Sequence, residues 1–191
     1  MTAAPVLPMS PEDFLAWERA QPDRHQYVRG EVFAMAGGSP RHNAIVANAI
    51  MALGVAVRGR GCTVLSSDQR IRSGAGDQYV YADASLVCGA LVLAEGTTDV
   101  LENPRVVIEV LSSSTEAYDR GEKWEGYQQI PGLRDYLLVS QAAPRVELFQ
   151  REDEAIWRYT VAGPGDLISL SSGAQLAVDA LYEGAMQLVA G

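Results

Sequence analysis

The strongest constraint on this chain is a pair of apolar runs that each carry one carboxylate in the middle. The runs are YVYADASLV at 79–87, which contains Asp83, and RVVIEVL at 105–111, which contains Glu109. Short apolar runs of this kind are typical of buried strands. Burying a carboxylate without a partner costs several kcal/mol, so such a residue usually pairs, binds a metal or stays protonated. A divalent cation shared by the two acids would explain the pattern.

The alternation of side chains along the two strands indicates where the acids meet. Successive residues face opposite sides of a sheet. Asp83 therefore shares a face with Tyr81 and Ser85, and Glu109 shares a face with Val107. If the strands pair with these faces aligned, the carboxylates converge and repel each other unless a cation lies between them. Ligation by oxygen alone favours Mg²⁺ or Mn²⁺, which also keep water molecules and bind phosphate oxygens.

A lysine follows the second run, in a segment expected to be helical over roughly 116–129. Spacing by three and four residues places Arg120, Lys123, Trp124 and Tyr127 near one helix face. The two aromatic residues should turn that face toward the sheet. Lys123 would then lie beside the carboxylates, where it could orient or help deprotonate a metal-bound water, or stabilise charge in the transition state. Tyr127 is an accessory candidate.

Composition is that expected of a soluble globular protein. The chain has 191 residues, of which 48% are hydrophobic and 20% charged, and no apolar run is long enough to span a bilayer. The start, MTAAPVLPMS, does not resemble a secretory signal. The net charge of −9 disfavours a protein that grips long stretches of phosphate backbone. Cys62 and Cys88 form no CxxC pair and only two histidines occur, so we expect neither a zinc site nor a disulfide framework, and a reduced cytoplasmic setting.

The order of elements predicts one domain over 1–191 with a mixed central sheet flanked by helices and added β-hairpins. Residues 1–9 are expected to form a loose tail. Helices should start at Ser10-Pro11 and Ser39-Pro40, where a serine cap precedes proline at the first helical position. Hairpins are expected over 25–37, turning at Arg29-Gly30, and over 145–161. The remaining expected strands cover 62–73, 135–140 and 167–170.

The acid–acid–lysine pattern resembles the PD-(D/E)-x-K nuclease fold, and the chain as a whole is similar to the Uma-two family of restriction-endonuclease-like proteins. The similarity rests on RHQYVRGEV at 24–32, SPRHNAIVANAI at 39–50, YADASLV at 81–87 and, most specifically, VIEVLSSSTEAYDRGEKWEGYQQIPGLRDYLLV at 107–139. The resemblance implies that Asp83 and Glu109 are metal ligands and that Lys123 is the catalytic lysine. The lysine comes from the following helix, because Leu111 stands at its usual position.

Four positions bear on this resemblance. Ala82 stands where family members commonly have proline, and Gln26 stands where they often have a glutamate, so one acidic ligand is missing. Glu31 is a nearby acidic candidate. His42 matches the family's helix histidine. We therefore treat Gln26, Glu31 and His42, with Tyr127, as accessory site candidates.

Each candidate also has a purely structural interpretation. Asp83 could face solvent from a half-exposed sheet, and a lone helix lysine such as Lys123 is commonly solvated. His42 could cap or pack the first helical turn, and Glu31 could be an exposed strand residue. The SSST turn at 112–115 could bind a phosphate or simply cap a helix, and Arg70 and Arg72 could meet nucleic acid or only protect a sheet edge.

These observations give a Mg²⁺- or Mn²⁺-dependent nuclease acting on DNA as the first hypothesis. The alternative is a catalytically weak or inactive nuclease-fold protein that acts as a binding or assembly module. A small-molecule hydrolase on the same scaffold is a weaker third hypothesis, and no G-x-S-x-G motif supports a serine hydrolase. We expect no membrane association. A homodimer is expected by analogy, since cutting two strands needs two sites.

Overall fold

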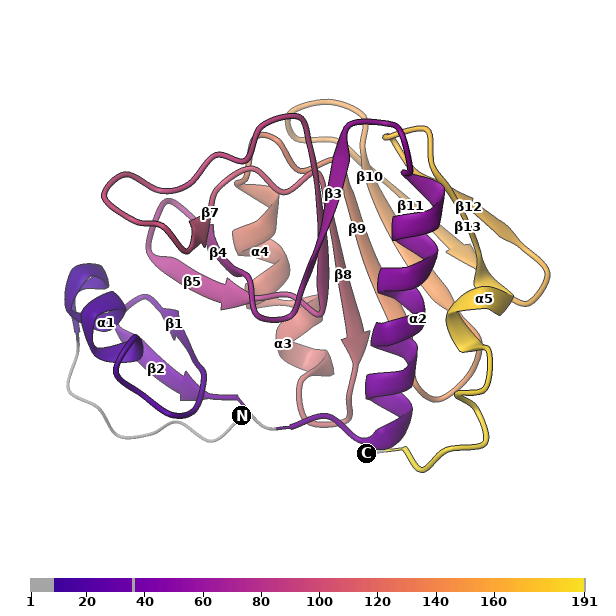
Figure 1. Cartoon of the computed structure of the whole chain (residues 1–191), viewed down its shortest axis with the longest axis horizontal. Helices are drawn as coiled ribbons and strands as arrows, with labels where there is room; N and C mark the ends of the chain where they lie inside the picture. Colours follow the sequence, from indigo (N-terminus) through magenta and orange to yellow (C-terminus); the bar gives the residue numbers. More distant parts are fainter. Residues whose placement is uncertain (1–8, 36, 191) are drawn as a thin grey trace.

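The computed structural model describes residues 9–35 and 37–190, and its main feature is a six-stranded mixed sheet (Figure 1). The strand order is β11-β10-β9-β8-β6-β3. Strands β8 and β9 are parallel, whereas the other neighbours are antiparallel. The bounds are Cys62–Ser66 for β3, Ala84–Cys88 for β6, Val106–Leu111 for β8, Asp135–Ser140 for β9, Val146–Arg151 for β10 and Trp157–Ala162 for β11.

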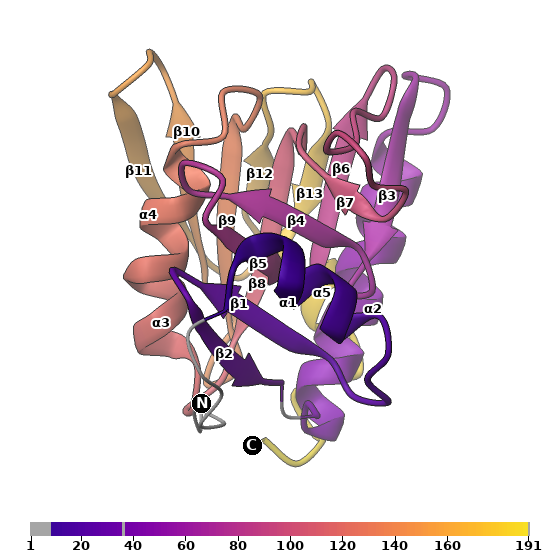
Figure 2. The same cartoon turned by 90° about the vertical axis from the view of Figure 1, so that its left-hand side faces the viewer.

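A smaller five-stranded sheet lies against one side of this large sheet, in front of it in Figure 2. Its order is β2-β1-β5-β4-β7. It carries helix α1 (Pro11–Glu18), whose Phe14 packs against the rings of Tyr27 and Tyr79. The bounds are His25–Val28 for β1, Glu31–Ala34 for β2, Arg70–Ser73 for β4, Gln78–Tyr81 for β5 and Val100–Leu101 for β7.

Helices cover the large sheet on both faces (Figure 1). On one face lie α2 (Pro40–Ala56), α5 (Val178–Tyr182) and the hairpin of β12 (Leu167–Ser169) and β13 (Gln175–Ala177). Their apolar side chains form one core with β6, β8 and β9. On the other face, α3 (Glu116–Arg120) and α4 (Glu122–Gln128) lie beside the smaller sheet, and Tyr127 belongs to a second core.

Local sequence signals account for several of these elements. The Ser10 and Ser39 side chains cap α1 and α2 by accepting from the amides of Asp13 and His42. The β1–β2 hairpin turns at Arg29 and Gly30, with φ angles of 48° and 96°. The expected mixed sheet with flanking helices is confirmed.

The first acidic run is not a single strand, contrary to the sequence-based expectation. Strand β5 ends at Tyr81 in the smaller sheet, and β6 begins at Ala84 in the large one. Asp83 lies in the crossing between them, and its Oδ2 accepts from the backbone amide of Val110 at 2.7 Å. This hydrogen bond therefore fixes the segment between β5 and β6 next to β8.

The helix expected over 116–129 is also divided, at Gly121. In the second part, Gly126 lies against β5, because an added Cβ there would be 1.9 Å from Oε1 of Gln78. Only glycine permits this approach of α4 to the smaller sheet. The approach brings α4 beside the end of β5.

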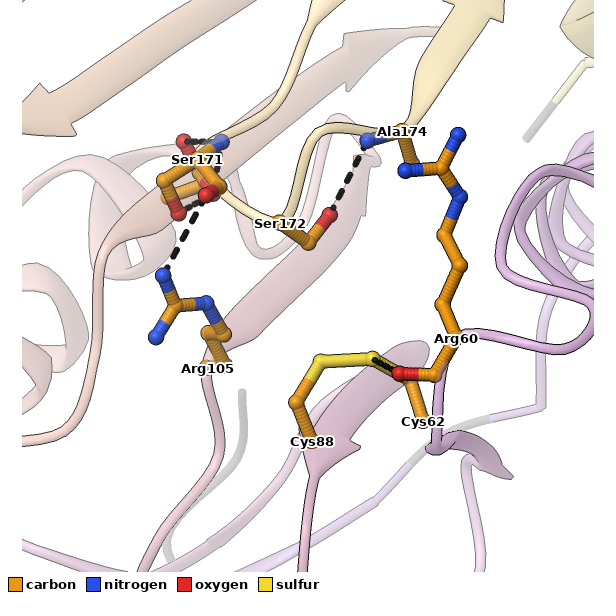
Figure 3. The surroundings of a disulfide bond; sticks show 8 residues. Arg60, Cys62, Cys88, Arg105, Ser171, Ser172 and Ala174 are labelled. Carbon is orange, nitrogen blue, oxygen red and sulfur yellow. Dashed lines mark hydrogen bonds between the residues drawn. A yellow bond between two sulfur atoms is a disulfide. The ribbon is translucent and has the colours of Figure 1, made fainter.

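Cys62 and Cys88 form a disulfide, so the expectation of two reduced cysteines is wrong in this structure (Figure 3). They are register partners at the first residue of β3 and the last residue of β6. The two positions are separated by 26 residues in sequence, and only the pairing of the strands brings them together.

The expected tail at 1–9 lies outside the described residues except for Met9, whose carbonyl accepts from the Tyr27 hydroxyl at 2.9 Å. Across residues 9–35 and 37–190, no helix has the length and apolar character needed to cross a membrane.

Candidate active site

The predicted acids and lysine lie at one cavity of about 390 Å³, which we call the site cavity. It lies between the crossing from β5 to β6, the end of β8, the start of α2 and helices α3 and α4. Its described lining includes Gln26, Ser39, His42, Tyr81, Asp83, Glu109, Ser112, Ser113, Ser114, Thr115, Tyr118, Asp119, Lys123 and Gln141.

Glu109 projects from the middle of β8 and is only 3% exposed. Its Oε1 accepts from the Tyr127 hydroxyl at 2.8 Å and lies 2.8 Å from Nζ of Lys123. Burial raises the pKa of Glu109 to about 8, against the opposing effect of Lys123, and the nearby carboxylates of Asp119 and Asp83 raise it further. An additional positive charge nearby would therefore stabilise the ionised form of this carboxyl group.

Lys123 is the only lysine in the chain, and it is 3% exposed. Its ammonium group lies 2.8 Å from Glu109, 3.0 Å from the carbonyl oxygen of Tyr81 and 3.4 Å from Oδ1 of Asp119. Burial alone would lower the pKa of Lys123, but the carboxylates of Glu109 and Asp119 outweigh it and hold the pKa above its ordinary value. Lys123 is therefore a fixed cation.

Asp83 is held at both carboxylate oxygens. Oδ2 accepts from the amide of Val110, and Oδ1 lies 3.2 Å from Nε2 of His42. The side chain remains 20% exposed toward the site cavity. Asp83 thus combines a fixed position with access for a ligand.

His42 reaches Asp83 from the first turn of α2. Burial lowers its pKa, but the hydrogen bond and charge of Asp83 outweigh this, so its pKa is raised overall. Gly38 allows the ring to sit here, because an added Cβ would lie 2.4 Å from Cδ2 of His42. The ring Nδ1 is buried without a hydrogen-bond partner in the described part of the chain.

Of the other accessory candidates, Gln26 is among the described residues that line the site cavity, whereas Tyr127 and Glu31 are not. Gln26 lines the cavity and accepts from the Tyr118 hydroxyl at 3.1 Å. Tyr127 bonds to Glu109, as described above. Glu31 is exposed on β2 and is not among the described residues that line the cavity. Gln26 leaves its corner of the cavity uncharged.

Asp119 is a buried cavity residue that sequence reasoning missed. It is 3% exposed, and its main-chain carbonyl accepts from the Tyr136 hydroxyl at 2.9 Å. The available signal was its spacing four residues before Lys123. Arg120, which was expected near the same face, instead bonds both oxygens of Glu147 at 2.9 Å.

The donor set of the site cavity fits Mg²⁺ or Mn²⁺. Asp83, Glu109 and Asp119 bring three carboxyl groups to this cavity, and Lys123 contacts two of them, Glu109 and Asp119. Among the described residues, no three His, Cys, Asp or Glu side chains converge as a complete metal cage. Mg²⁺ does not need one, because it binds through one or two carboxylates and completes its shell with water and substrate phosphate.

A family model and two proteins of one organism are similar to this chain. A family model named Uma2, described as "Putative restriction endonuclease", matches residues 11–180. The chain is similar to the uncharacterized protein slr1290 of Synechocystis sp., with 36% identity over 183 residues and 95% of each chain covered. It is also similar to sll1609 of that organism, with 27% identity over 160 residues, which cover 84% of this chain and 90% of the relative.

A solved structure gives the fold. The crystal structure of a protein from Anabaena variabilis, described as a putative nuclease belonging to DUF820, matches with a TM-score of 0.74 and 17% identity. The match covers 93% of this chain and 99% of that one. The predicted restriction-endonuclease-like fold is confirmed.

Proposed function

Since the chain belongs to the Uma2 family, described as "Putative restriction endonuclease", we propose that it is a Mg²⁺-dependent nuclease that hydrolyses phosphodiester bonds of DNA. Family and fold support a nuclease. One observation carries the finer proposal: the only lysine of the chain lines one cavity together with Asp83, from the crossing between β5 and β6, and Glu109, from β8. A lysine that only solvates a helix face would be exposed, whereas Lys123 is buried in this cavity.

Asp83 and Glu109 would hold the Mg²⁺, for which Mn²⁺ can substitute. Asp83 offers a fixed, partly exposed carboxylate, and Glu109 offers a buried one that gains from added positive charge. When bound, such a cation activates water and neutralises charge on the phosphate. His42 and the amide of Val110 keep Asp83 oriented toward the cavity.

Lys123 would stabilise the negative charge that develops on the phosphate oxygens. In hydrolysis, a bond forms from the water oxygen to phosphorus and the water releases one proton to solvent. The bond to the sugar oxygen breaks, and that oxygen takes up a proton from solvent. Because neighbouring carboxylates hold the pKa of Lys123 above its ordinary value, the side chain stays an ammonium group and has no free lone pair to accept the proton of the water. Orientation of the attacking water and electrostatic stabilisation fit it better than general-base catalysis.

A cleavage assay with labelled DNA in Mg²⁺ or Mn²⁺ tests this proposal. Asp83→Ala and Lys123→Ala should abolish cleavage, while Glu152→Gln, which lies after β10 and away from the site cavity, should cleave like the parent. Equal cleavage by all of these proteins would remove Asp83 and Lys123 from the mechanism. No cleavage by the parent on any DNA would contradict the proposed activity.

One observation favours the second candidate, a catalytically weak or inactive binding or assembly module. Gln26 is 5% exposed in the site cavity and supplies an amide where an acid would strengthen metal binding. Calorimetric titration with Mg²⁺ separates the two candidates. Binding that disappears in Asp83→Ala would count against an inactive module. The homodimer and the cytoplasmic location stay predictions, and sedimentation equilibrium would test the homodimer.

A further inference from the structure

The arginine side chains of this protein are almost all engaged by its own structure. The chain has a net charge of −9, and its positive charge comes from Lys123 and from arginines. Eight arginines form ion pairs with Asp or Glu: Arg19, Arg24, Arg29, Arg70, Arg72, Arg120, Arg145 and Arg158. A paired arginine has to leave its own acid to bind a phosphate, so these side chains offer little free charge.

Three further arginines are held by main-chain carbonyls. Arg41 bonds the carbonyls of Gln141, Met186 and Leu188, and Arg105 bonds that of Ser171. Arg151 bonds several carbonyls around Leu133. These guanidinium groups already donate hydrogen bonds to main-chain carbonyls of the protein itself.

The remaining arginines lie at the wrong end of the large sheet for the site cavity. Arg58 and Arg60 follow the last residue of α2, whereas His42 lines the cavity from its first turn. A helix of 17 residues separates the two ends by about 25 Å. Arg134 directly precedes β9 at the strand end opposite the site, because Asp135 pairs with Val106 at the start of β8.

The site cavity itself presents a single, deeply placed cation. Among the described residues that line it there is no arginine, and Lys123 is 3% exposed. The exposed residues of its described lining are all uncharged: Ala34, Gly37, Gly38, Ser113 and Ser114. A scissile phosphate must therefore enter the cavity to come near Lys123.

We propose that the substrate is single-stranded DNA or an unpaired strand end, bound through one or two phosphates; this rests on the proposed nuclease function. A flexible strand can bend one nucleotide into the cavity. A duplex must be deformed to do so, and contacts to flanking phosphates normally offset that cost. The engaged arginines leave this chain without such contacts. A single-stranded substrate also requires only one site.

The salt dependence of cleavage tests this directly. We would measure kcat/KM in Mg²⁺ for one labelled sequence as a single strand, as a blunt duplex and as a duplex with an unpaired end, over a series of salt concentrations. The unpaired substrates should be preferred. The slope of log kcat/KM against log salt should be about −0.7 to −1.4, since each phosphate contacted on a single strand contributes about −0.7.

A pair of variants with equal charge change supplies the control. Glu116 directly follows Thr115 at the cavity rim, and Glu152 lies at the far end of the large sheet, after β10. Glu116→Lys should raise kcat/KM at low salt and steepen the slope by about −0.7. Glu152→Lys should change neither, although it alters the net charge equally. Equal effects of the two variants would contradict phosphate binding at the cavity rim.

Other outcomes separate this inference from the proposed function. Preference for the blunt duplex, with a slope near −5 as expected for about six phosphate contacts, would overturn the single-strand proposal and leave the nuclease intact. Cleavage of none of the three substrates would overturn both.

Discussion

The ammonium nitrogen of Lys123 lies 2.8 Å from Oε1 of Glu109, and both side chains are 4% exposed. The contact joins helix α4 to the central strand β8 inside the site cavity. A buried pair of this kind is weak support for stability, since desolvation offsets much of the Coulomb attraction. Its placement at a cavity shared with Asp83 supports a functional interpretation.

Glu109 should make the stability of the protein fall as the pH rises. Burial raises its pKa in the folded state to about 8, whereas its ordinary value is 4.5. The folded state holds this proton more tightly, so the contribution to stability is complete below the unfolded pKa and is lost as the pH rises through the folded pKa. We expect the free energy of unfolding to fall across that window by an amount on the order of several kcal/mol, since each unit of pKa difference is worth about 1.4 kcal/mol.

Urea denaturation at a series of pH values checks this dependence. Glu109→Gln should flatten the profile between the two pKa values, because glutamine does not titrate. Glu116→Gln, an exposed control on α3, should keep the slope of the parent. An unchanged slope in Glu109→Gln would show that other groups cause the effect.

Asp119 should restrict the position of the Lys123 ammonium. In Asp119→Asn, the charge at 3.4 Å is lost, while the contacts of the ammonium group with Glu109 and with the carbonyl of Tyr81 remain. We expect kcat to fall about ten-fold, equivalent to about 1.4 kcal/mol, with KM nearly unchanged. Because the chain has one lysine, a ¹³C-lysine label gives one side-chain signal, whose relaxation should report greater mobility. Unchanged relaxation and kcat would exclude this role.

The local parts of the fold were predictable from sequence. The two Ser-Pro helix starts and the Arg29-Gly30 turn depend on neighbouring residues only, and Asp135–Ser140 is the strand that its apolar run indicated. The approach of Lys123 to Glu109 followed from helix spacing together with strand alternation. The roles of these residues in catalysis stay predictions.

The features that sequence reasoning missed all depend on tertiary structure. The apolar pattern of 79–87 is the same on both sides of Asp83, so nothing local marks where the chain leaves one sheet for the other. The Cys62–Cys88 bond requires the register of β3 with β6. Asp119 looks like an ordinary helix acid until Lys123 is placed inside the cavity.

Arg120 and Glu147 should contribute stability that acid removes. Two hydrogen bonds from Arg120 hold the pKa of Glu147 at about 2, below its ordinary value of 4.5. A lowered folded pKa gives stability that is present above the unfolded pKa and is lost as the pH falls toward the folded pKa. Since Arg120 is 36% exposed, solvent screening reduces the effect, and we expect Arg120→Gln to cost roughly 1–2 kcal/mol at neutral pH.

The matched control for this pair is Arg158→Gln. Arg158 and Glu152 are 56% and 50% exposed, so their ion pair should add almost nothing to stability. Thermal unfolding should give Arg120→Gln a lower Tm than the parent at neutral pH, and this deficit in Tm should shrink on acidification. An equal deficit at both pH values would mean that lost packing, and not charge, causes it.

The Cys62–Cys88 disulfide should stabilise the segment that carries Asp83. It closes a loop with a sequence separation of 26 residues, and the chain-entropy model gives roughly 3 kcal/mol for such a loop. Cys62→Ala combined with Cys88→Ala should lower the free energy of unfolding by about this amount. Alkylation of the denatured, unreduced protein followed by mass spectrometry checks the bond itself, and two alkylated thiols would contradict it.

The central claim is that Asp83 and Glu109 hold a divalent cation beside Lys123. The most direct test is an Mn²⁺ titration of ¹³C-lysine-labelled protein, because the only lysine lies 2.8 Å from Glu109. Paramagnetic Mn²⁺ at this site should broaden the single lysine signal beyond detection, Mg²⁺ should compete, and Asp83→Ala should keep the signal sharp. A signal that stays sharp in the parent at saturating Mn²⁺ would contradict the metal site.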